Sequence, residues 1–143
     1  MKLLISEVLQ KVHSAKTKAQ KVKILQDNNT NALRSVLIAN FDETVQSLLP
    51  EGDVPFEKND APVGTEHTVL EQEYRKLYLF FKGGSSIKQS QRENLFIQML
   101  EGLSIEEAEL LILVKDKALN KKYRVTRACV ETAFPSIEWG NRG

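Results

Sequence analysis

Residues 104–116 read SIEEAELLILVKD, and this stretch decides the fold. Ser104, followed three residues later by Glu107, forms a capping box, in which the serine oxygen accepts an unpaired amide at the start of a helix. The residues that follow are apolar on nearly every side, which is typical of a helix buried in the middle of a protein. The stretch therefore predicts a central helix against which the rest of the chain packs.

Apolar residues recur at helical spacing on both sides of this stretch, and no segment shows the sustained period-two alternation of a strand. We therefore predict an all-α fold, a compact bundle of about seven or eight short helices. Thr30 or Asn31 caps the third of them, and Thr126 caps the last. The predicted helices cover residues 3–12, 19–25, 31–41, 44–49, 68–82, 87–101, 104–116 and 126–134.

The clearest of these helices is the one over Thr68–Lys82. Its apolar face is predicted to contain Leu70, Tyr74, Leu77, Tyr78 and Phe81.

One long irregular segment divides the chain. Residues 50–68 contain three Pro and two Gly without any period, as in a loop. We expect a single helical domain over 1–143, with an N-terminal lobe 1–49, an irregular acidic loop 50–66 and a C-terminal lobe 67–139. Phe56 and Val63 are expected to hold parts of the loop against the body of the protein.

The charges are unevenly distributed, although the net charge is only +1. Residues 8–26 contain five Lys and no acid, residues 51–73 contain seven acids and one Lys, and residues 115–127 contain six basic residues and one Asp. A near-neutral protein of this kind can present one basic and one acidic surface. The Lys-rich part over 16–23 is predicted to be a solvated helix face.

Most catalytic and metal-binding chemistry has no counterpart in the sequence. The single cysteine, Cys129, excludes an internal disulfide and a cysteine-based zinc site, and its apolar neighbours favour a packed thiol over a nucleophile. His13 and His67 lie in separate segments without partner ligands, and no nucleotide-binding or hydrolase glycine motif occurs. No apolar run approaches the length of a membrane span. We expect a soluble intracellular protein that is not an enzyme and takes no cofactor or metal.

Two turns combine basic residues with the start of a helix, where unpaired amides and the helix dipole favour phosphate. The glycines of the first turn would let a sugar–phosphate backbone come close. If the turns share a face, they predict salt-sensitive, sequence-independent binding; capped loops with lysines for solubility are the alternative. The first turn comprises Lys82, Gly83, Gly84, Ser85 and Lys88, and the second comprises Lys115, Lys117, Lys121, Lys122, Arg124, Thr126 and Arg127.

Two stretches of the chain, 3–50 and 74–137, resemble a known family. The second stretch is the more specific. It contains a basic helix, a Gly turn, a helix with a Leu-rich end, an acidic-capped apolar helix, a basic loop, and a short helix that closes on AFPSI (133–137). This order resembles the α-helical N-terminal DNA-binding domain of ATP-dependent DNA ligases, in particular the T-even phage type. The resemblance implies contacts to duplex DNA through the minor groove beside a nick, made by the residues of the two basic turns. A ligase also needs a Lys-x-Asp-Gly motif, and KDKA (115–118) lacks the Gly, so we expect no ligation.

The segments NDAPVGTEH (59–67) and KKYRVTRACVETAFP (121–135) look like those of a small uncharacterised protein family of T-even-like phages and cyanophages. This second resemblance implies a protein that acts in the host bacterial cytoplasm during infection. Our first hypothesis is a non-catalytic protein that binds double-stranded DNA, intact or nicked, in phage DNA replication, repair or host takeover. The alternative is a protein-interaction module, an inhibitor or adaptor of a host or phage replication factor that binds through the acidic 51–73 segment. A phage structural protein is a third option.

Overall fold

The computed structural model describes residues 3–57 and 68–140. Within them the chain forms seven α-helices, two 3₁₀-helices and no strand, which confirms the predicted all-α fold. The elements are α1 (Ile5–Ser14), α2 (Lys18–Asp27), α3 (Asn31–Phe41), α4 (Leu70–Glu73), η1 (Tyr74–Phe80), α5 (Gln89–Gly102), α6 (Ile105–Lys115), η2 (Leu119–Lys121) and α7 (Arg127–Ala133).

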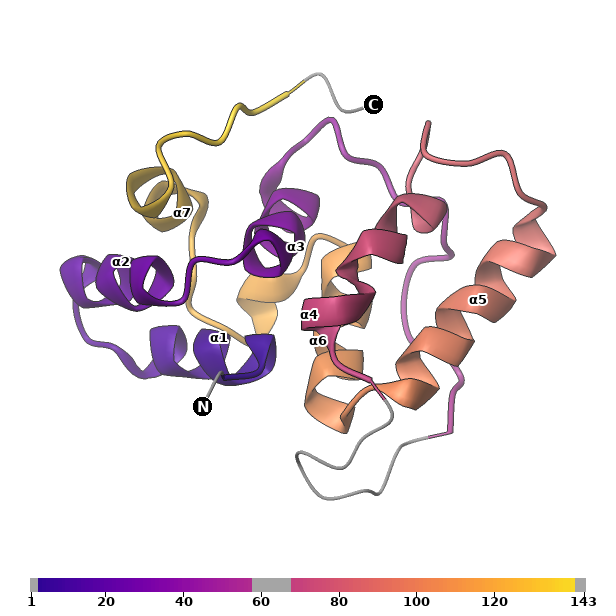
Figure 1. Ribbon diagram of the computed structural model, residues 1–143, viewed down its shortest axis with the longest axis horizontal. Coiled ribbons are helices and arrows are strands. Elements are labelled where there is room, and N and C mark those ends of the chain that lie inside the picture. The colour runs from indigo at the N-terminus through magenta and orange to yellow at the C-terminus, as the bar shows by residue number, and fades with distance from the viewer. Residues whose placement is uncertain (1–2, 58–67, 141–143) are drawn as a thin grey trace.

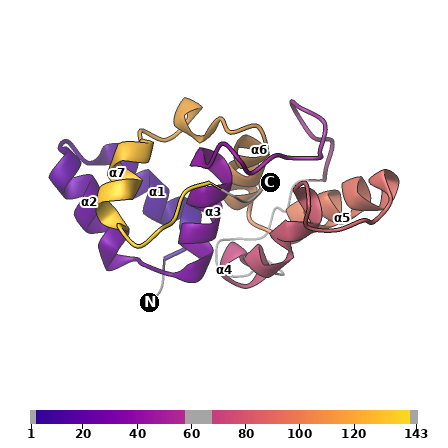
Figure 2. The same cartoon turned by 90° about the horizontal axis from the view of Figure 1, so that it is seen from above.

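Helix α6 lies in the middle of the molecule, as its sequence predicts. It contacts α1, α3 and α5, and its residues Leu110, Leu111 and Val114 are buried. Figures 1 and 2 show α1, α2 and α7 gathered at one end and α4 and α5 at the other, with α3 between them. The protein is therefore built around one apolar helix that reaches both ends.

The predicted hydroxyl caps are present at three helix starts. The capping box predicted for Ser104 and Glu107 is confirmed in its serine half, while the Glu107 oxygens accept the amides of Ile5 and Leu70. The Thr30 hydroxyl accepts the Leu33 amide at 3.1 Å, and the Ser104 hydroxyl accepts the Glu107 amide at 3.2 Å. The Thr126 hydroxyl accepts the amide of Cys129 at 3.3 Å. Each cap satisfies one of the amides that have no partner in the first turn of a helix.

The side chain of Glu107 connects three helices. It is completely buried, and its two carboxylate oxygens accept the amide of Ile5 at 3.2 Å and the amide of Leu70 at 3.0 Å. These amides belong to the first residues of α1 and α4. One carboxylate from α6 therefore pairs the starts of two other helices and complements their dipoles.

The short helix predicted over 44–49 is wrong. This segment is extended at Ser47, which forms an isolated antiparallel bridge with Phe81. The Leu48 amide donates to the Phe80 carbonyl at 2.9 Å, and the Lys82 amide donates to the Gln46 carbonyl at 2.8 Å. Pairing with a segment more than thirty residues away replaces the local helix.

The single helix predicted over Thr68–Lys82 is also wrong, because the segment changes from α4 to the 3₁₀-helix η1 at Tyr74. Leu77 and Phe80, three residues apart, are both buried, and a 3₁₀-helix places residues at this spacing on one face. Tyr78 was predicted on the apolar face, but it is 55% exposed. The 3₁₀ period therefore places Leu77 and Phe80 together in the core, and it turns Tyr78 toward solvent.

Helix α7 packs against α2, which packs against α1. Since α2 belongs to the predicted lobe 1–49 and α7 to the predicted lobe 67–139, both lobes contribute to this end of the molecule. The described part of the predicted loop, residues 50–57, contains no helix, and Phe56 packs against the core as expected. Val63 and the rest of the loop lie outside the described residues.

We expect Glu107→Gln to lower the free energy of unfolding by about 2–3 kcal/mol, because a neutral amide leaves one buried backbone N–H without its acceptor. The measurement is urea unfolding followed by helical circular dichroism. Glu106→Gln is the matched control, since Glu106 is the exposed neighbour on the same turn. Equal stability of the two variants would contradict the role of Glu107 as a shared cap.

Candidate nucleic-acid interface

Lys115 from the second predicted turn is a core residue. Its side chain is only 2% exposed, and its ammonium donates to the carbonyls of Pro50 at 2.9 Å and Gly52 at 2.7 Å. It also pairs with Asp116 at 2.9 Å, and Asp116 accepts the Gly52 amide at 3.0 Å. Lys115 thus attaches the 50–52 segment to the end of α6. The prediction that it contacts phosphate is wrong, because it is buried.

Lys117 is committed to the end of another helix. Its ammonium donates to the carbonyls of Ala39 at 3.0 Å and Asp42 at 2.6 Å, at the C-terminus of α3. A cation is favourable there because the last carbonyls of a helix are unpaired and carry the negative end of the dipole. Burial lowers the pKa of Lys117, and the nearby Asp42 and Glu43 carboxylates act in the opposite direction. We therefore remove Lys117 from the predicted interface.

The remaining basic residues of this turn lie near the surface. Lys122 pairs with Glu109 at 3.1 Å, and Arg127 pairs with Glu131 at 2.8 Å while its guanidinium lies 4.6 Å from the centre of the Trp139 ring. Lys121 and the side chain of Arg124 are exposed, and neither forms an ion pair with another residue in the described ranges.

In the turn between η1 and α5, Gly83 has a φ of 87°, which favours glycine, and Lys82 and Lys88 are exposed. The Ser85 hydroxyl accepts the Ile87 amide at 3.4 Å. Gly84 has a packing role: a Cβ atom built there would lie 2.0 Å from the Tyr78 carbonyl oxygen. Gly84 is thus explained by the close approach of the Tyr78 backbone, without an approaching sugar–phosphate backbone.

The buried Arg92 holds this turn in place. Its Nε donates to the Leu79 carbonyl at 2.9 Å, and Nη2 donates to the carbonyls of Ser85 at 3.3 Å and Ile87 at 3.2 Å. One guanidinium therefore fixes both sides of the turn.

The two predicted basic turns do not come together. The 82–88 turn leads into α5 at one end of the molecule, and the 122–126 segment leads into α7 at the other end, as both views show (Figures 1 and 2). A duplex that contacted both turns, as the ligase-type contact implies, would therefore have to span the length of the molecule.

The structure places a different pair of basic segments side by side. The Arg124 amide donates to Nδ1 of His13 at 3.0 Å, and the Lys21 ammonium donates to the Arg124 carbonyl. These contacts join the second turn to α1 and α2, at residues within the stretch 8–26 that contains five Lys and no acid. We call the cations of this junction and of the start of α2 the α2 basic surface. It is defined by the exposed Lys16, Lys18 and Arg124 and by the half-buried Lys21.

Sequence reasoning assigned the lysines of this surface to a solvated helix face. Lys18 and Lys21 are three residues apart on α2, so they share one side of the helix. Lys16 and Lys18 flank Thr17, whose hydroxyl accepts the Gln20 amide at 3.2 Å as the cap of α2, and the first turn of α2 contains no acid. The sequence signal for this surface was the run of lysines without acids. The contribution of Arg124 could not be found in the same way, because Arg124 lies about a hundred residues away in the sequence.

Comparisons with known proteins give a family and no function. Residues 8–121 match the model of DUF6433, a family of unknown function. The chain belongs to the DUF6433 family. The DUF6433 match runs from within α1 to the end of η2 and ends before Arg124 and α7. No curated protein matches the chain, and no solved structure matches it.

Two further searches of the described residues concern membranes and metals. No helix in residues 3–57 or 68–140 has the length and apolar character needed to cross a bilayer. The same residues contain no cluster of three or more His, Cys, Asp or Glu side chains that could hold a metal ion.

We expect Lys117→Gly to be more stable than Lys117→Ala by about 1 kcal/mol, although both lose the contacts to α3. Lys117 has a φ of 54°, a conformation that glycine adopts without strain and alanine does not. Thermal unfolding of the two variants gives the difference. Lys121, the last residue of η2, has no positive φ, so Lys121→Ala should be more stable than Lys121→Gly. The same order at both positions would contradict this explanation.

Proposed function

We propose that this protein is a non-catalytic nucleic-acid-binding module that contacts the phosphates of duplex DNA through the α2 basic surface. The observation that carries the proposal is the junction of Lys21 with the Arg124 carbonyl, which adds the exposed Arg124 to the acid-free lysine segment. Clustered cations without neighbouring carboxylates bind the DNA backbone and release its counterions.

Three basic residues near the surface are neutralised by carboxylates of the protein and are left out of the proposed interface. Lys23, Lys122 and Arg127 pair with Asp27, Glu109 and Glu131. By contrast, Lys16 and Lys18 are exposed, and neither has an ion-pair partner among the described residues. Unpaired surface cations provide the strongest attraction for phosphate because no carboxylate competes with it.

Duplex DNA is proposed as the ligand because of the resemblance to ligase DNA-binding domains, and a role in phage DNA replication, repair or host takeover is part of the same proposal. We leave the 82–88 turn out of the proposed interface, because it lies at the other end of the molecule from α2. The proposed contact is therefore with phosphates along one face of the protein, and it does not require a nick.

We expect Lys18→Glu combined with Arg124→Glu to weaken binding to a short fluorescein-labelled duplex at least about tenfold. The slope of log affinity against log salt should become shallower by about one per lost phosphate contact. Fluorescence anisotropy over a salt series measures both, on intact and nicked duplexes, and circular dichroism confirms that the helices remain.

The matched control is Lys82→Glu combined with Lys88→Glu, which changes the charge by the same amount in the other predicted turn. This variant should bind like the wild type. Absent or salt-independent binding by the wild type would refute the proposed function. Loss of binding in the control variant would show that the DNA contacts the 82–88 turn.

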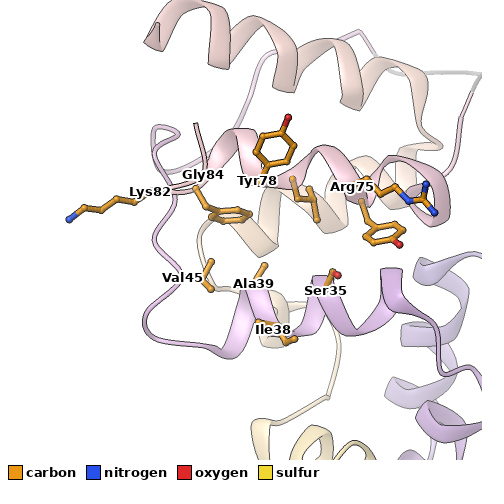
Figure 3. A pocket seen from close by; sticks show the side chains of 12 residues that line it. Ser35, Ile38, Ala39, Val45, Arg75, Tyr78, Lys82 and Gly84 are labelled. Atoms are coloured by element: carbon orange, nitrogen blue, oxygen red, sulfur yellow. The ribbon is translucent and has the colours of Figure 1, made fainter. Parts of the chain in front are cut away.

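A second candidate function, a protein-interaction module, is favoured by a different observation. An apolar groove between α3 and η1 has aromatic side chains in its lining, and the exposed Tyr78 borders it, with its ring directed away from α3 (Figure 3). In the acidic segment, Glu51, Asp53 and Glu57 are exposed, which suits a protein contact there. If the wild type fails to bind any duplex, this candidate replaces the first.

A further inference from the structure

We propose that the groove between α3 and η1 is a docking site for an acidic, apolar peptide segment of a partner protein. This site is separate from the α2 basic surface, and it does not depend on DNA binding. The proposal rests on the apolar walls of the groove, the sign of the charges at its ends and the contacts that fix its shape.

The groove is an open, mostly apolar hollow of about 550 Å³. Figure 3 shows side chains of α3 on one side and of η1 and the following turn on the other. A hollow of this size suits several apolar side chains of a peptide. Its lining consists of Ser35, Ile38, Ala39, Val45, Tyr74, Arg75, Leu77, Tyr78, Phe81, Lys82, Gly83 and Gly84.

The charges of the lining have one sign. Arg75 and Lys82 are its charged residues, and no Asp or Glu lines the groove. Figure 3 shows the two cations at opposite ends, with the Lys82 side chain extending away from the groove. Both residues are exposed and form no ion pair within the described part of the chain. A ligand with carboxylates on either side of an apolar centre complements this arrangement.

The length of the groove wall suits a short peptide. The seven residues of η1 span about 14 Å of 3₁₀-helix, which equals about nine residues of an α-helix or four of an extended strand. One short amphipathic segment can therefore follow η1 with its apolar residues in the groove and its carboxylates toward either end.

Tyr78 is the exposed large hydrophobic residue of the described chain, at 55% exposure. Tyrosine is enriched among the residues that dominate binding energy at protein interfaces, because it buries a large ring and still offers a hydroxyl. The change from α4 to η1 directs Tyr78 outward while Leu77 and Phe80 remain in the core.

The groove is held in shape by contacts on both sides. The bridge between Ser47 and Phe81 joins the segment after α3 to the end of η1, and Arg92 fixes the carbonyls of Leu79 and Ser85. Gly84 packs directly on the Tyr78 backbone. Walls that are already ordered lose little conformational entropy when a ligand binds.

The lining favours a peptide over single-stranded nucleic acid. Binding of single strands uses a row of open aromatic faces along a basic track. Here Tyr74 and Phe81 are partly buried, aliphatic residues such as Ile38 and Val45 form much of the wall, and two cations are too few for a track. The apolar walls and the two cations suit a peptide in which aliphatic and aromatic side chains are flanked by carboxylates.

The test is a selection of random displayed peptides on the full chain, followed by fluorescence anisotropy with the enriched peptides as labelled probes. We expect enriched peptides to combine Asp or Glu with Leu, Phe or Trp. Arg75→Glu combined with Lys82→Glu should weaken their binding at least tenfold, and Tyr78→Ser about tenfold. Lys76→Glu combined with Lys88→Glu is the control with the same charge change outside the groove, and it should bind the peptides like the wild type.

Three results would overturn the proposal: no enrichment, enrichment of peptides without acidic residues, or equal binding by wild type and groove variants. A labelled oligothymidylate that binds the wild type and loses affinity in the Tyr78→Ser variant would instead assign the groove to single-stranded nucleic acid. Circular dichroism of each variant separates loss of the site from loss of the fold. Duplex binding by the groove variants, measured in parallel, shows separately whether the proposed function holds.

Discussion

The structure depends on a buried carboxylate that receives amides from two distant segments. A charge in a protein interior is unfavourable unless hydrogen bonds compensate for its lost hydration, so Glu107 constrains whatever surrounds it. Its oxygens hold the first residue of α1, Ile5, and the first residue of α4, Leu70, against α6. Helix α4 continues directly into η1, and α1 is followed by α2. The same side chain therefore lies one element away from each proposed binding surface.

Cations in this chain serve either the fold or the surface, and their position decides which. Lys115, Lys117 and Arg92 each donate to several backbone carbonyls. Lys115 and Arg92 fix irregular segments, and Lys117 fixes the end of α3. A long basic side chain can satisfy two or three acceptors at once, which suits it to irregular backbone. Arg124 contributes to both tasks, because its backbone joins α1 and α2 while its side chain remains exposed.

Features with a local cause could be predicted from the sequence. The caps at Thr30, Ser104 and Thr126 and the central position of α6 each depend on residues within one or two helical turns. The structure of the 44–49 and 68–82 segments could not be predicted, because tertiary contacts override local propensity there. In the first segment Ser47 forms a bridge with Phe81, and in the second Leu77 and Phe80 are buried together. The same limit applies to the candidate site. Nothing near Lys115 or Lys121 in the sequence shows that one reaches the Pro50 carbonyl and the other reaches solvent.

The packing of α7 on α2 also affects how the chain reaches its native state. Residues of these helices meet although about a hundred positions separate them, as in the hydrogen bond from Gln26 to the Ala133 carbonyl. Contacts of high sequence separation form slowly, since a long loop must close before they add any stability. During synthesis, α2 leaves the ribosome well before its partner α7. A ten-residue helix is marginally stable by itself in water, so during this interval α2 depends on its capping box and on its packing against α1.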